Sequence, residues 1–330
     1  MTAEQIKKMP KLDLHCHLDG SLAIQSIREL LGREVAKEEL QVSDDCQSLA
    51  EYLEKFDLPL QCLQTAEGLR TASRDFLLEA AKENVVYIEA RFAPLLSVNE
   101  KLSCRQVIEA VLQGLAEGKE KCGVEYNVIA CAMRHHSPEQ NRGMFQAAEE
   151  FLGKGLCALD LAGNEAAFPM KDFSGLFEEA SRMGFPFTLH AGECGSVENI
   201  IESIKCGAAR IGHGIAMRGQ REVIALCRNR HIGIEMCPVS NLQTKAVPDK
   251  SVYPLREFLD SGLLITVNTD NRAVSNTTIT KEMEFIQREY GVRDEELWQL
   301  TRNAVEVSFA KEPVKERLFD RIKAAEGKVL

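Results

Sequence analysis

The amino-acid sequence predicts one parallel (β/α)8 barrel, a TIM barrel of the α/β class, over residues 1–330. Short apolar runs alternate with longer amphipathic stretches along the chain, which is typical of α/β proteins. Polar side chains suited to chemistry gather at the ends of those runs, as they do at the mouth of a barrel. A composition of 45% hydrophobic and 27% charged residues is that of an ordinary folded enzyme.

The predicted strands are apolar runs at 12–15, 85–92, 125–132, 156–161, 187–190, 210–212, 233–236 and 264–268. Most are rich in β-branched or aromatic residues and are bounded by turn signals. Apolar periodicity predicts helices at 76–84, 104–121, 139–153, 173–183, 197–205, 220–229 and 253–261. A helical insertion, interpreted as a lid, is expected at about 21–75. The region 281–330, with Trp298, is interpreted as packing.

A doubly wound open sheet is the competing fold. That fold would normally carry a Gly-rich phosphate turn after its first strand, and Asp19-Gly20-Ser21 is not that motif. The barrel is favoured because polar residues lie at or just beyond the carboxyl ends of the predicted strands, which meet at one mouth. These residues are His15, His17, Glu89, Arg91, Asp160, His190, Glu193, His213, Ser240 and Asp270.

The net charge, the hydropathy and the cysteine content argue against several classes of function. A formal charge of −10 argues against nucleic acid, because phosphate binding needs a concentrated basic surface. No apolar run is long enough to span a bilayer and the first residues lack a secretory core, so we expect a cytoplasmic protein without membrane partners. Eleven cysteines without Cys-x-x-Cys spacing indicate reduced thiols. Cysteine is left out of the metal shell, although Cys16 and Cys194 neighbour candidate ligands.

The stretch Asp13-Leu14-His15-Cys16-His17 is the most informative in the chain. Residues two apart share one face of a strand, so His15 and His17 converge from the end of the first predicted strand. Two converging imidazoles make half of a metal site. The alternative is a pair of half-exposed histidines in an N-terminal turn.

Later strand ends supply the other half of this site. His190, His213 and Asp270 end the fifth, sixth and eighth predicted strands. Imidazole nitrogens with one carboxylate suit Zn²⁺ better than Ca²⁺ or Mg²⁺. We assign four ligands that leave a position for water, namely His15, His17, His190 and Asp270. Glu193 could then donate a proton to a substrate, and His213 could orient or deprotonate the water or be a further ligand. The reaction class is metal-assisted hydrolysis.

Several segments, in order and spacing, closely resemble the adenosine deaminase family. They are residues 13–20, Ser137-Pro138 after Met133-Arg134-His135, Asp160-Leu161-Ala162-Gly163, residues 190–193, Gly212-His213-Gly214, Cys237-Pro238 with Ser240-Asn241, and Asn268-Thr269-Asp270. The resemblance implies a barrel with one zinc ion per subunit. It also implies hydrolysis of adenosine and 2′-deoxyadenosine to inosine products and ammonia, a reaction of purine salvage.

The same resemblance implies roles for individual residues. It supports the ligand set above and casts His213 as the group that positions the attacking hydroxide. Glu193 would protonate purine N1, which requires a raised pKa. Asp270 would pass the water proton to the departing amine.

The resemblance also implies contacts with the nucleoside. The backbone N–H of Gly163 would reach N3, although this glycine could merely permit a turn. Asp19, with His17 beside it, would accept a hydrogen bond from the ribose 5′-hydroxyl and disfavour a 5′-phosphate. Leu53 and Phe56 match an apolar lid, although such residues are more often ordinary core.

One departure from the family pattern follows Asp270. The family commonly has a second aspartate and a proline there, whereas this chain has Asn271-Arg272. The aspartate must be protonated to donate to purine N7, but an asparagine amide donates at any pH. We therefore expect Asn271 to keep the N7 contact. Arg272 leaves open an anionic substrate group, with solvated surface charge as the favoured interpretation.

Three alternative functions compete with adenosine deamination. A deaminase of adenine, of an N6-substituted nucleoside or of an adenosine-like intermediate is the main alternative. A non-catalytic nucleoside-binding protein would be expected to have lost Glu193, His213 or the ligands, and all are present. A binuclear amidohydrolase would need a carboxylated lysine on the fourth strand, and 156–161 contains none.

Overall fold

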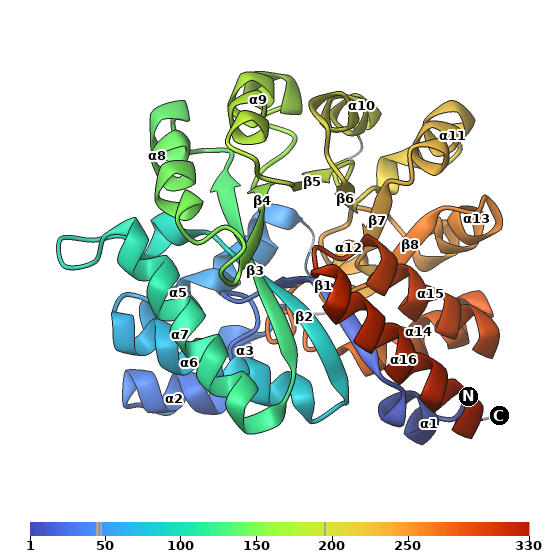
Figure 1. The fold of residues 1–330 in the computed structure, drawn as a ribbon, viewed down its shortest axis with the longest axis horizontal. Coiled ribbons are helices and arrows are strands. Elements are labelled where there is room, and N and C mark those ends of the chain that lie inside the picture. The colour runs from blue at the N-terminus through green and yellow to red at the C-terminus, as the bar shows by residue number, and fades with distance from the viewer. Residues whose placement is uncertain (44–45, 47, 195, 330) are drawn as a thin grey trace.

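Eight parallel strands follow one another in chain order in the computed structural model, which describes residues 1–43, 46, 48–194 and 196–329 (Figure 1). The strands are β1 (Lys11–His17), β2 (Val85–Phe92), β3 (Glu125–Met133), β4 (Leu156–Ala162), β5 (Thr188–Ala191), β6 (Arg210–His213), β7 (Gly233–Met236) and β8 (Leu264–Val267). β1–β4 form one sheet and β5–β8 a second. Single parallel bridges join the sheets at both seams, Leu159 with Phe187 and Cys16 with Asp270. The predicted barrel is confirmed.

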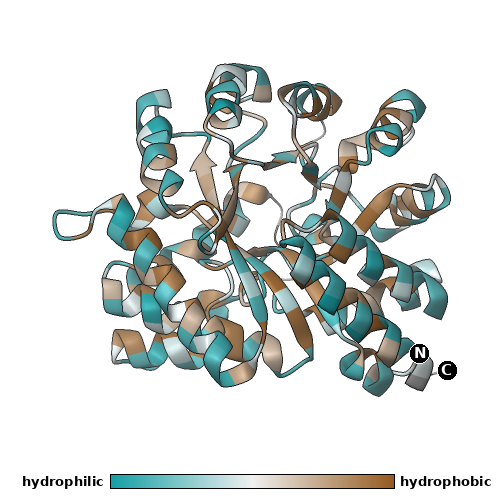
Figure 2. Ribbon diagram, viewed as in Figure 1, coloured by the Kyte–Doolittle hydropathy of each residue, from teal (hydrophilic) through white to brown (hydrophobic). Residues whose placement is uncertain are grey.

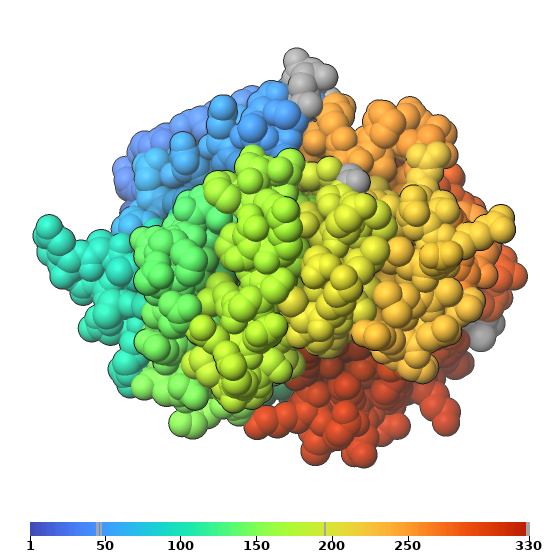
Figure 3. Space-filling view, turned by 90° about the horizontal axis from the view of Figure 1, so that it is seen from above, coloured from blue at the N-terminus to red at the C-terminus, as the bar shows by residue number. Residues whose placement is uncertain are grey.

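Helices surround these strands (Figure 1), and segments that follow one another in the chain lie side by side on the surface (Figure 3). The α-helices are α1 (Ala3–Lys8), α2 (Ile24–Leu31), α3 (Lys37–Leu40), α4 (Leu49–Leu53), α5 (Asp57–Cys62), α6 (Ala66–Ala81), α7 (Cys104–Cys122), α8 (Pro138–Glu149), α9 (Ser174–Arg182), α10 (Val197–Cys206), α11 (Arg221–Asn229), α12 (Pro238–Gln243), α13 (Leu255–Asp260), α14 (Ile279–Tyr290), α15 (Asp294–Val307) and α16 (Glu312–Val329). Short 3-10 turns are η1 (Glu54–Phe56), η2 (Pro94–Ser97), η3 (Met170–Phe173), η4 (Ile215–Met217) and η5 (Lys250–Val252). No helix in the described ranges has both the length and the apolar character that crossing a bilayer requires.

Several helix boundaries differ from the sequence prediction, and two of the larger differences have local reasons. α6 begins ten residues before the predicted start, at Ala66, because the Thr65 side chain accepts a hydrogen bond from the backbone of Gly68 and caps the helix. α8 ends at Glu149 and not at 153, because Gly153 and Gly155 adopt positive φ angles in the turn before β4. The lengths of the strands were predicted more closely than those of the helices.

The segment between β1 and β2 is helical, as expected for the insertion at about 21–75. It contains α2 to α5, η1 and the first part of α6. Residues 44, 45 and 47 of this insertion, and residue 330 of the C-terminal region, lie outside the described residues. α14 to α16 pack at the end of the chain, where Trp298 is buried in the core as predicted.

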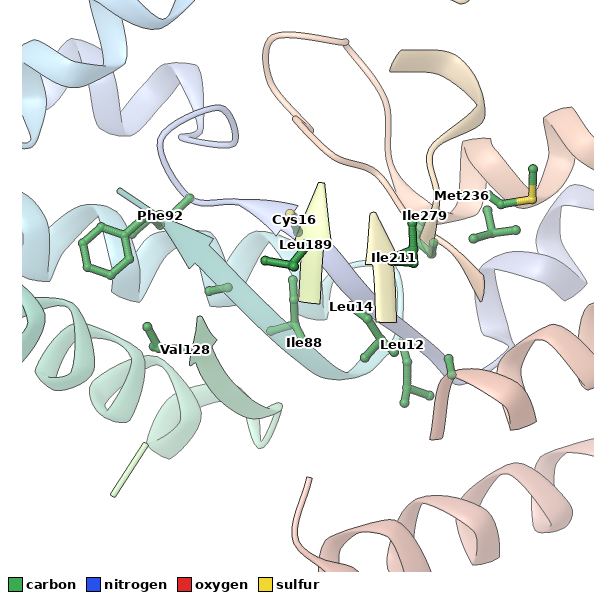
Figure 4. Packing of buried hydrophobic residues seen from close by; sticks show 14 of the residues in the cluster. Leu12, Leu14, Cys16, Ile88, Phe92, Val128, Leu189, Ile211, Met236 and Ile279 are labelled. Carbon is green, nitrogen blue, oxygen red and sulfur yellow. The ribbon is translucent and has the colours of Figure 1, made fainter. Parts of the chain in front are cut away.

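The main apolar core lies between the strands and the surrounding helices. Leu12, Leu14 and Cys16 come from alternate positions of β1, and Figure 4 shows them with apolar side chains of neighbouring strands. Helices are correspondingly striped, apolar on one face and polar on the other (Figure 2). Because side chains alternate along a strand, the residues between these point into the barrel.

The barrel interior holds a network of buried ion pairs. Arg91 bonds to Asp160 and to Glu235, each at 2.8 Å. Arg210 bonds to Glu235 at 2.6 Å and to Glu89 at 2.5 Å. All five side chains are inaccessible to solvent. Each of the three carboxylates therefore bonds to at least one of the two guanidinium groups, and buried charges require such partners.

The last residue of α15 and the segment after it cover the side of this network that faces away from the site. The backbone N–H of Phe309 donates to Glu89 at 2.6 Å, and Arg210 donates to the carbonyl of Val307 at 3.0 Å. The Phe309 ring lies 3.9 Å from the Arg210 guanidinium carbon. Glu89 is thus part of the barrel floor, and the prediction that it lies at the mouth is wrong. It sits in the middle of β2, where alternation along the strand turns it inward but at a deeper level than the site.

Arg210→Met should lower the free energy of unfolding by about 3–5 kcal/mol, because it leaves the buried Glu89 without its guanidinium and removes one of the two that bond to Glu235. Urea denaturation of the purified variant measures this change. Arg317→Ala is the matched control, since Arg317 pairs with Glu125 at the surface, and it should change stability little. Equal midpoints for wild type and Arg210→Met would contradict the assignment of this network as structurally essential.

Candidate metal centre and active site

Four predicted ligands converge at the carboxyl ends of the strands. His15 and His17 leave the same face of β1, and the Nε2 atoms of both lie next to the Nε2 atom of His190, at 3.1 and 3.2 Å. Asp270 Oδ1 lies 3.4 Å from His15 Nε2 and 3.5 Å from His17 Nε2. Residues from β1, β5 and the end of β8 thus face one point.

Carboxylates below the site orient two of these rings. His15 Nδ1 lies 2.7 Å from Glu235 Oε2, and His190 Nδ1 lies 2.9 Å from Asp160 Oδ2. Burial opposes ionisation of Asp160, but His190 and Arg91 hold the pKa of this carboxyl well below its usual range. An ionised carboxylate accepts the Nδ1 proton and leaves Nε2 as a bare lone pair.

The Nε2 atoms of His15 and His190 show whether a metal ion fits this site. If both rings are neutral and their Nδ1 protons point at these carboxylates, the two Nε2 lone pairs lie 3.1 Å apart, repel each other and cannot form a hydrogen bond. A cation between them removes this repulsion. Imidazole nitrogens together with one carboxylate oxygen are the ligands that zinc and similar transition metals prefer. The donor set therefore fits such an ion.

His213 lies beside the same point but is held differently. Its Nδ1 is 2.9 Å from the Asn241 amide, and its Nε2 is 3.7 Å from Glu193 Oε2. One ligand atom each of His15, His190, His213 and Asp270 lies within 4.8 Å of the others, so His213 is also close enough to coordinate. Geometry alone accommodates both predicted roles of His213, as a ligand and as the group that orients water.

Backbone strain marks two of these positions. His213 has a φ of 64° and Asp270 a φ of 58°, in the left-handed region that non-glycine residues rarely adopt. Such conformations cost about 1–3 kcal/mol each and gather at functional sites. The strain here turns both side chains toward the common point.

A cavity of about 290 Å³ opens above this cluster. Except for His15, which lies beneath it, every predicted site residue lines the cavity. These residues are His17, Asp19, Leu53, Phe56, Gly163, His190, Glu193, His213, Asp270 and Asn271. The volume is close to the lower end for small-molecule sites, roughly 300 Å³.

Two carboxyl groups in the cavity have raised pKa values. Burial, together with the nearby carboxylates Asp270 and Glu165, raises the pKa of Glu193 to about 8. This side chain is therefore mostly protonated at neutral pH and able to donate. Burial raises the pKa of Asp19 to about 7. The expected repulsion between Asp19 and a 5′-phosphate is correspondingly weaker near neutrality.

Comparison with known proteins agrees with this geometry. The sequence model described as adenosine deaminase matches residues 10–325. The chain belongs to the adenosine deaminase family. A relative named adenosine deaminase from Enterococcus faecalis is 39% identical over 334 residues, covering 98% of this chain and 99% of the relative. The predicted resemblance is confirmed.

Solved structures show the same fold. An Arabidopsis protein complexed with IMP has a TM-score of 0.88 at 24% identity and covers 99% of this chain and 100% of its own. An amidohydrolase from Burkholderia ambifaria with bound Zn has a TM-score of 0.86 at 19% identity, covering 99% of this chain and 94% of its own. Members of the adenosine deaminase family are metal-dependent, in agreement with the histidine cluster.

Two glycines near the site of this family member are restrained in different ways. Gly163 has a φ of 105°, and a Cβ there would make only ordinary contacts at 3.6 Å, so backbone conformation is the restraint within the protein itself. A Cβ on Gly20 would overlap the Asn271 side chain. Asn271 is buried, and its Oδ1 has no hydrogen-bond partner among the described residues.

Arg272 is not a solvated surface charge, and that interpretation is wrong. The side chain is buried and forms an ion pair with Glu83, whose second oxygen accepts the backbone N–H of Thr280 at 3.0 Å. The backbone N–H of Arg272 donates to Ser21 Oγ at 2.9 Å. Arg272 thus anchors the loop after β8 from below. The sequence hid this role because its partner, Glu83, lies far away in the chain.

Sequence reasoning also missed Glu165, which shapes the loop that carries Glu193. The buried carboxylate accepts the backbone N–H groups of Gly192, Glu193 and Cys194 at 2.6, 2.9 and 3.1 Å. The Asn199 amide donates to it at 2.8 Å. Its position two residues after Gly163 was the available signal, because that loop leaves a strand end. His135, Tyr52 and Thr244 also line the cavity without having been predicted.

All eleven cysteines are free thiols, as predicted. Cys16 points away from the ligands, with its Sγ 3.3 Å from Thr269 Oγ1 and 3.4 Å from Ser21 Oγ. Cys194 is exposed at the rim.

Proposed function

We propose that this chain catalyses the metal-dependent hydrolytic deamination of adenosine and 2′-deoxyadenosine, releasing inosine or 2′-deoxyinosine and ammonia in purine salvage. Membership of the adenosine deaminase family supports this reaction. The observation that carries the proposal is the pairing of two groups in one cavity. A cluster of imidazoles suited to a metal ion lies beside Glu193, a carboxyl group with a pKa of about 8.

Zinc is the proposed metal, one ion per subunit, held by His15, His17, His190 and Asp270. When bound, zinc lowers the pKa of a coordinated water from 15.7 to about 7. The bare Nε2 atoms of His15 and His190 support this choice, as does the bound Zn named for the Burkholderia amidohydrolase. His213 is left out of the proposed ligand set because its Nε2 faces Glu193.

Each remaining group then has a defined task. Glu193 donates its proton to purine N1, which draws electron density away from C6. His213, fixed through Nδ1 by Asn241, orients the attacking water with its Nε2 atom. Asp270 takes the water proton and passes it to the departing amine. The Ser240 hydroxyl donates to Asp270 Oδ2 at 2.5 Å and so keeps the other oxygen toward the histidines.

The cavity walls hold the nucleoside in this proposal. The Gly163 N–H contacts N3, the Asn271 amide contacts N7, and Asp19 with His17 binds the 5′-hydroxyl. Leu53 and Phe56 cover the substrate as part of the lid at about 21–75. The cavity lining in the described residues contains no lysine or arginine, and Arg272 is already paired with Glu83. A 5′-phosphate would therefore lack a cationic partner, which favours nucleosides over nucleotides.

Zinc-loaded wild-type protein should convert adenosine to inosine, followed by purine absorbance and ammonia release. Glu193→Gln should lower kcat by about 10²- to 10⁴-fold, because the general acid is lost, while zinc content stays unchanged. Glu222→Gln, at an exposed position of α11, is the matched control and should behave as wild type. Inactive zinc-loaded wild type would refute the proposed function. Zinc loss in Glu193→Gln would point to a structural part for this carboxylate.

The pH profile reports the protonation of Glu193. We expect kcat/KM for adenosine to fall above about pH 8, by about tenfold per unit, since only the protonated carboxyl can donate. Glu165→Gln removes a neighbouring negative charge, so ionised Glu193 becomes less unfavourable and its pKa falls. The alkaline limb should therefore move to lower pH in this variant. A limb that stays in place would contradict the electrostatic part assigned to Glu165.

Asn271→Ala should lower kcat/KM for adenosine by about 10- to 100-fold, because a buried donor to purine N7 is lost. The same variant should no longer discriminate between adenosine and 7-deazaadenosine, which lacks that acceptor. Steady-state kinetics on both substrates measure the two effects. Unchanged adenosine turnover with 7-deazaadenosine still disfavoured would show that Asn271 does not contact N7.

A further inference from the structure

The lid and the loop after β8 meet in a small apolar cluster separate from the main core. Cys46, Tyr52 and Val274 form its buried centre. The backbone N–H of Val42 donates to the carbonyl of Val274 at 2.9 Å. Val274 follows Asp270 closely in sequence, so this cluster joins the lid to the loop that carries catalytic and substrate-binding residues.

Tyr52 adds a side-chain hydrogen bond to this junction. Its side chain comes from α4, lines the cavity and is almost wholly buried. The Tyr52 hydroxyl lies 2.6 Å from Ser275 Oγ. The backbone N–H of Ser275 in turn donates to the carbonyl of Asn271 at 2.8 Å. A chain of two hydrogen bonds thus runs from the lid to the residue proposed to contact N7.

The hydroxyl sits among polar groups of the site. Side chains of Ser240 and Asn271, as well as Ser275, interact with it. Ser240 is the residue that donates to Asp270. A phenylalanine at position 52 would fill the same apolar cluster but could make none of these polar contacts, so packing of the ring alone does not account for the hydroxyl.

We propose that the hydrogen bond between Tyr52 and Ser275 fastens the lid in its closed position, which makes Tyr52 a positioning residue for substrate binding. The inference rests on the proposed function in one respect, namely that adenosine is the substrate of the kinetic test. The lid supplies Leu53 and Phe56 to the cavity wall in this arrangement, in which α4 lies against the loop after β8. When this hydrogen bond is weakened, the lid is closed in a smaller fraction of the molecules.

The expected kinetic signature follows from this population shift. When only the closed form binds substrate well, apparent affinity falls in proportion to the closed fraction. Once substrate is bound, its contacts with the lid favour closure, so the chemical step proceeds at nearly the wild-type rate. Loss of the hydroxyl should therefore act on KM and leave kcat nearly unchanged.

The test compares Tyr52→Phe, Ser275→Ala and the double variant. Each single variant should raise KM for adenosine by about 3- to 10-fold, the range for one hydrogen bond, with kcat changed less than about twofold. The double variant should be no worse than the singles, because both remove the same interaction. Tyr126→Phe is the matched control and should leave both constants unchanged, since the Tyr126 hydroxyl on β3 donates to the carbonyl of Leu112 on α7, away from the cavity.

Hydrogen exchange supplies a readout that does not depend on activity. Amides of α4 should exchange faster in zinc-loaded Tyr52→Phe than in wild type, while those of α10 should not change. An unchanged KM with unchanged α4 exchange would overturn the proposal. So would a lower kcat at constant KM, which would mean that the hydroxyl acts on Asp270 through Ser240. An inactive wild type would instead refute the proposed function, and the exchange result would still decide the fastening.

Discussion

Everything at the mouth of this barrel depends on the charge balance beneath it. Asp160 and Glu235 orient the rings of His190 and His15, and Arg91 bonds to both carboxylates. Ionised carboxylates in the interior of a protein are stable only with such partners. The guanidinium thus keeps the acceptors charged, and the charged acceptors keep Nε2 of each histidine free for a metal ion.

Two neighbouring carboxyl groups in the same low-dielectric interior have pKa values that are shifted in opposite directions. Asp270 lies among histidines, which hold its pKa well below the usual range despite burial. Burial dominates at Glu193, where further carboxylates add to the effect and raise the pKa to about 8. One group is thereby ready to accept a proton and the other to donate one. This separation follows from placement on different strand ends and not from residue type.

The sequence revealed those parts of the molecule that depend on local pattern. Strands β2 and β7 were predicted at their observed bounds, because buried parallel strands are compact apolar runs. The histidines and Asp270 were found because they end such runs. Glu89 was misplaced, since alternation along a strand reveals the face of the sheet but not the depth within a barrel. Arg272 was interpreted wrongly and Tyr52 was missed, because their partners Glu83 and Ser275 lie far away in the chain and only tertiary packing brings them close.

The floor of the barrel has a consequence for biosynthesis. Val307 and Phe309, which bond to Arg210 and Glu89, leave the ribosome after all eight strands have been made. Until they arrive, the lower layer of charges stays open to water and keeps its hydration. Docking of residues 307–309 therefore expels that water. A nascent chain can assemble its strands early, yet its interior becomes dry only after these residues have been made.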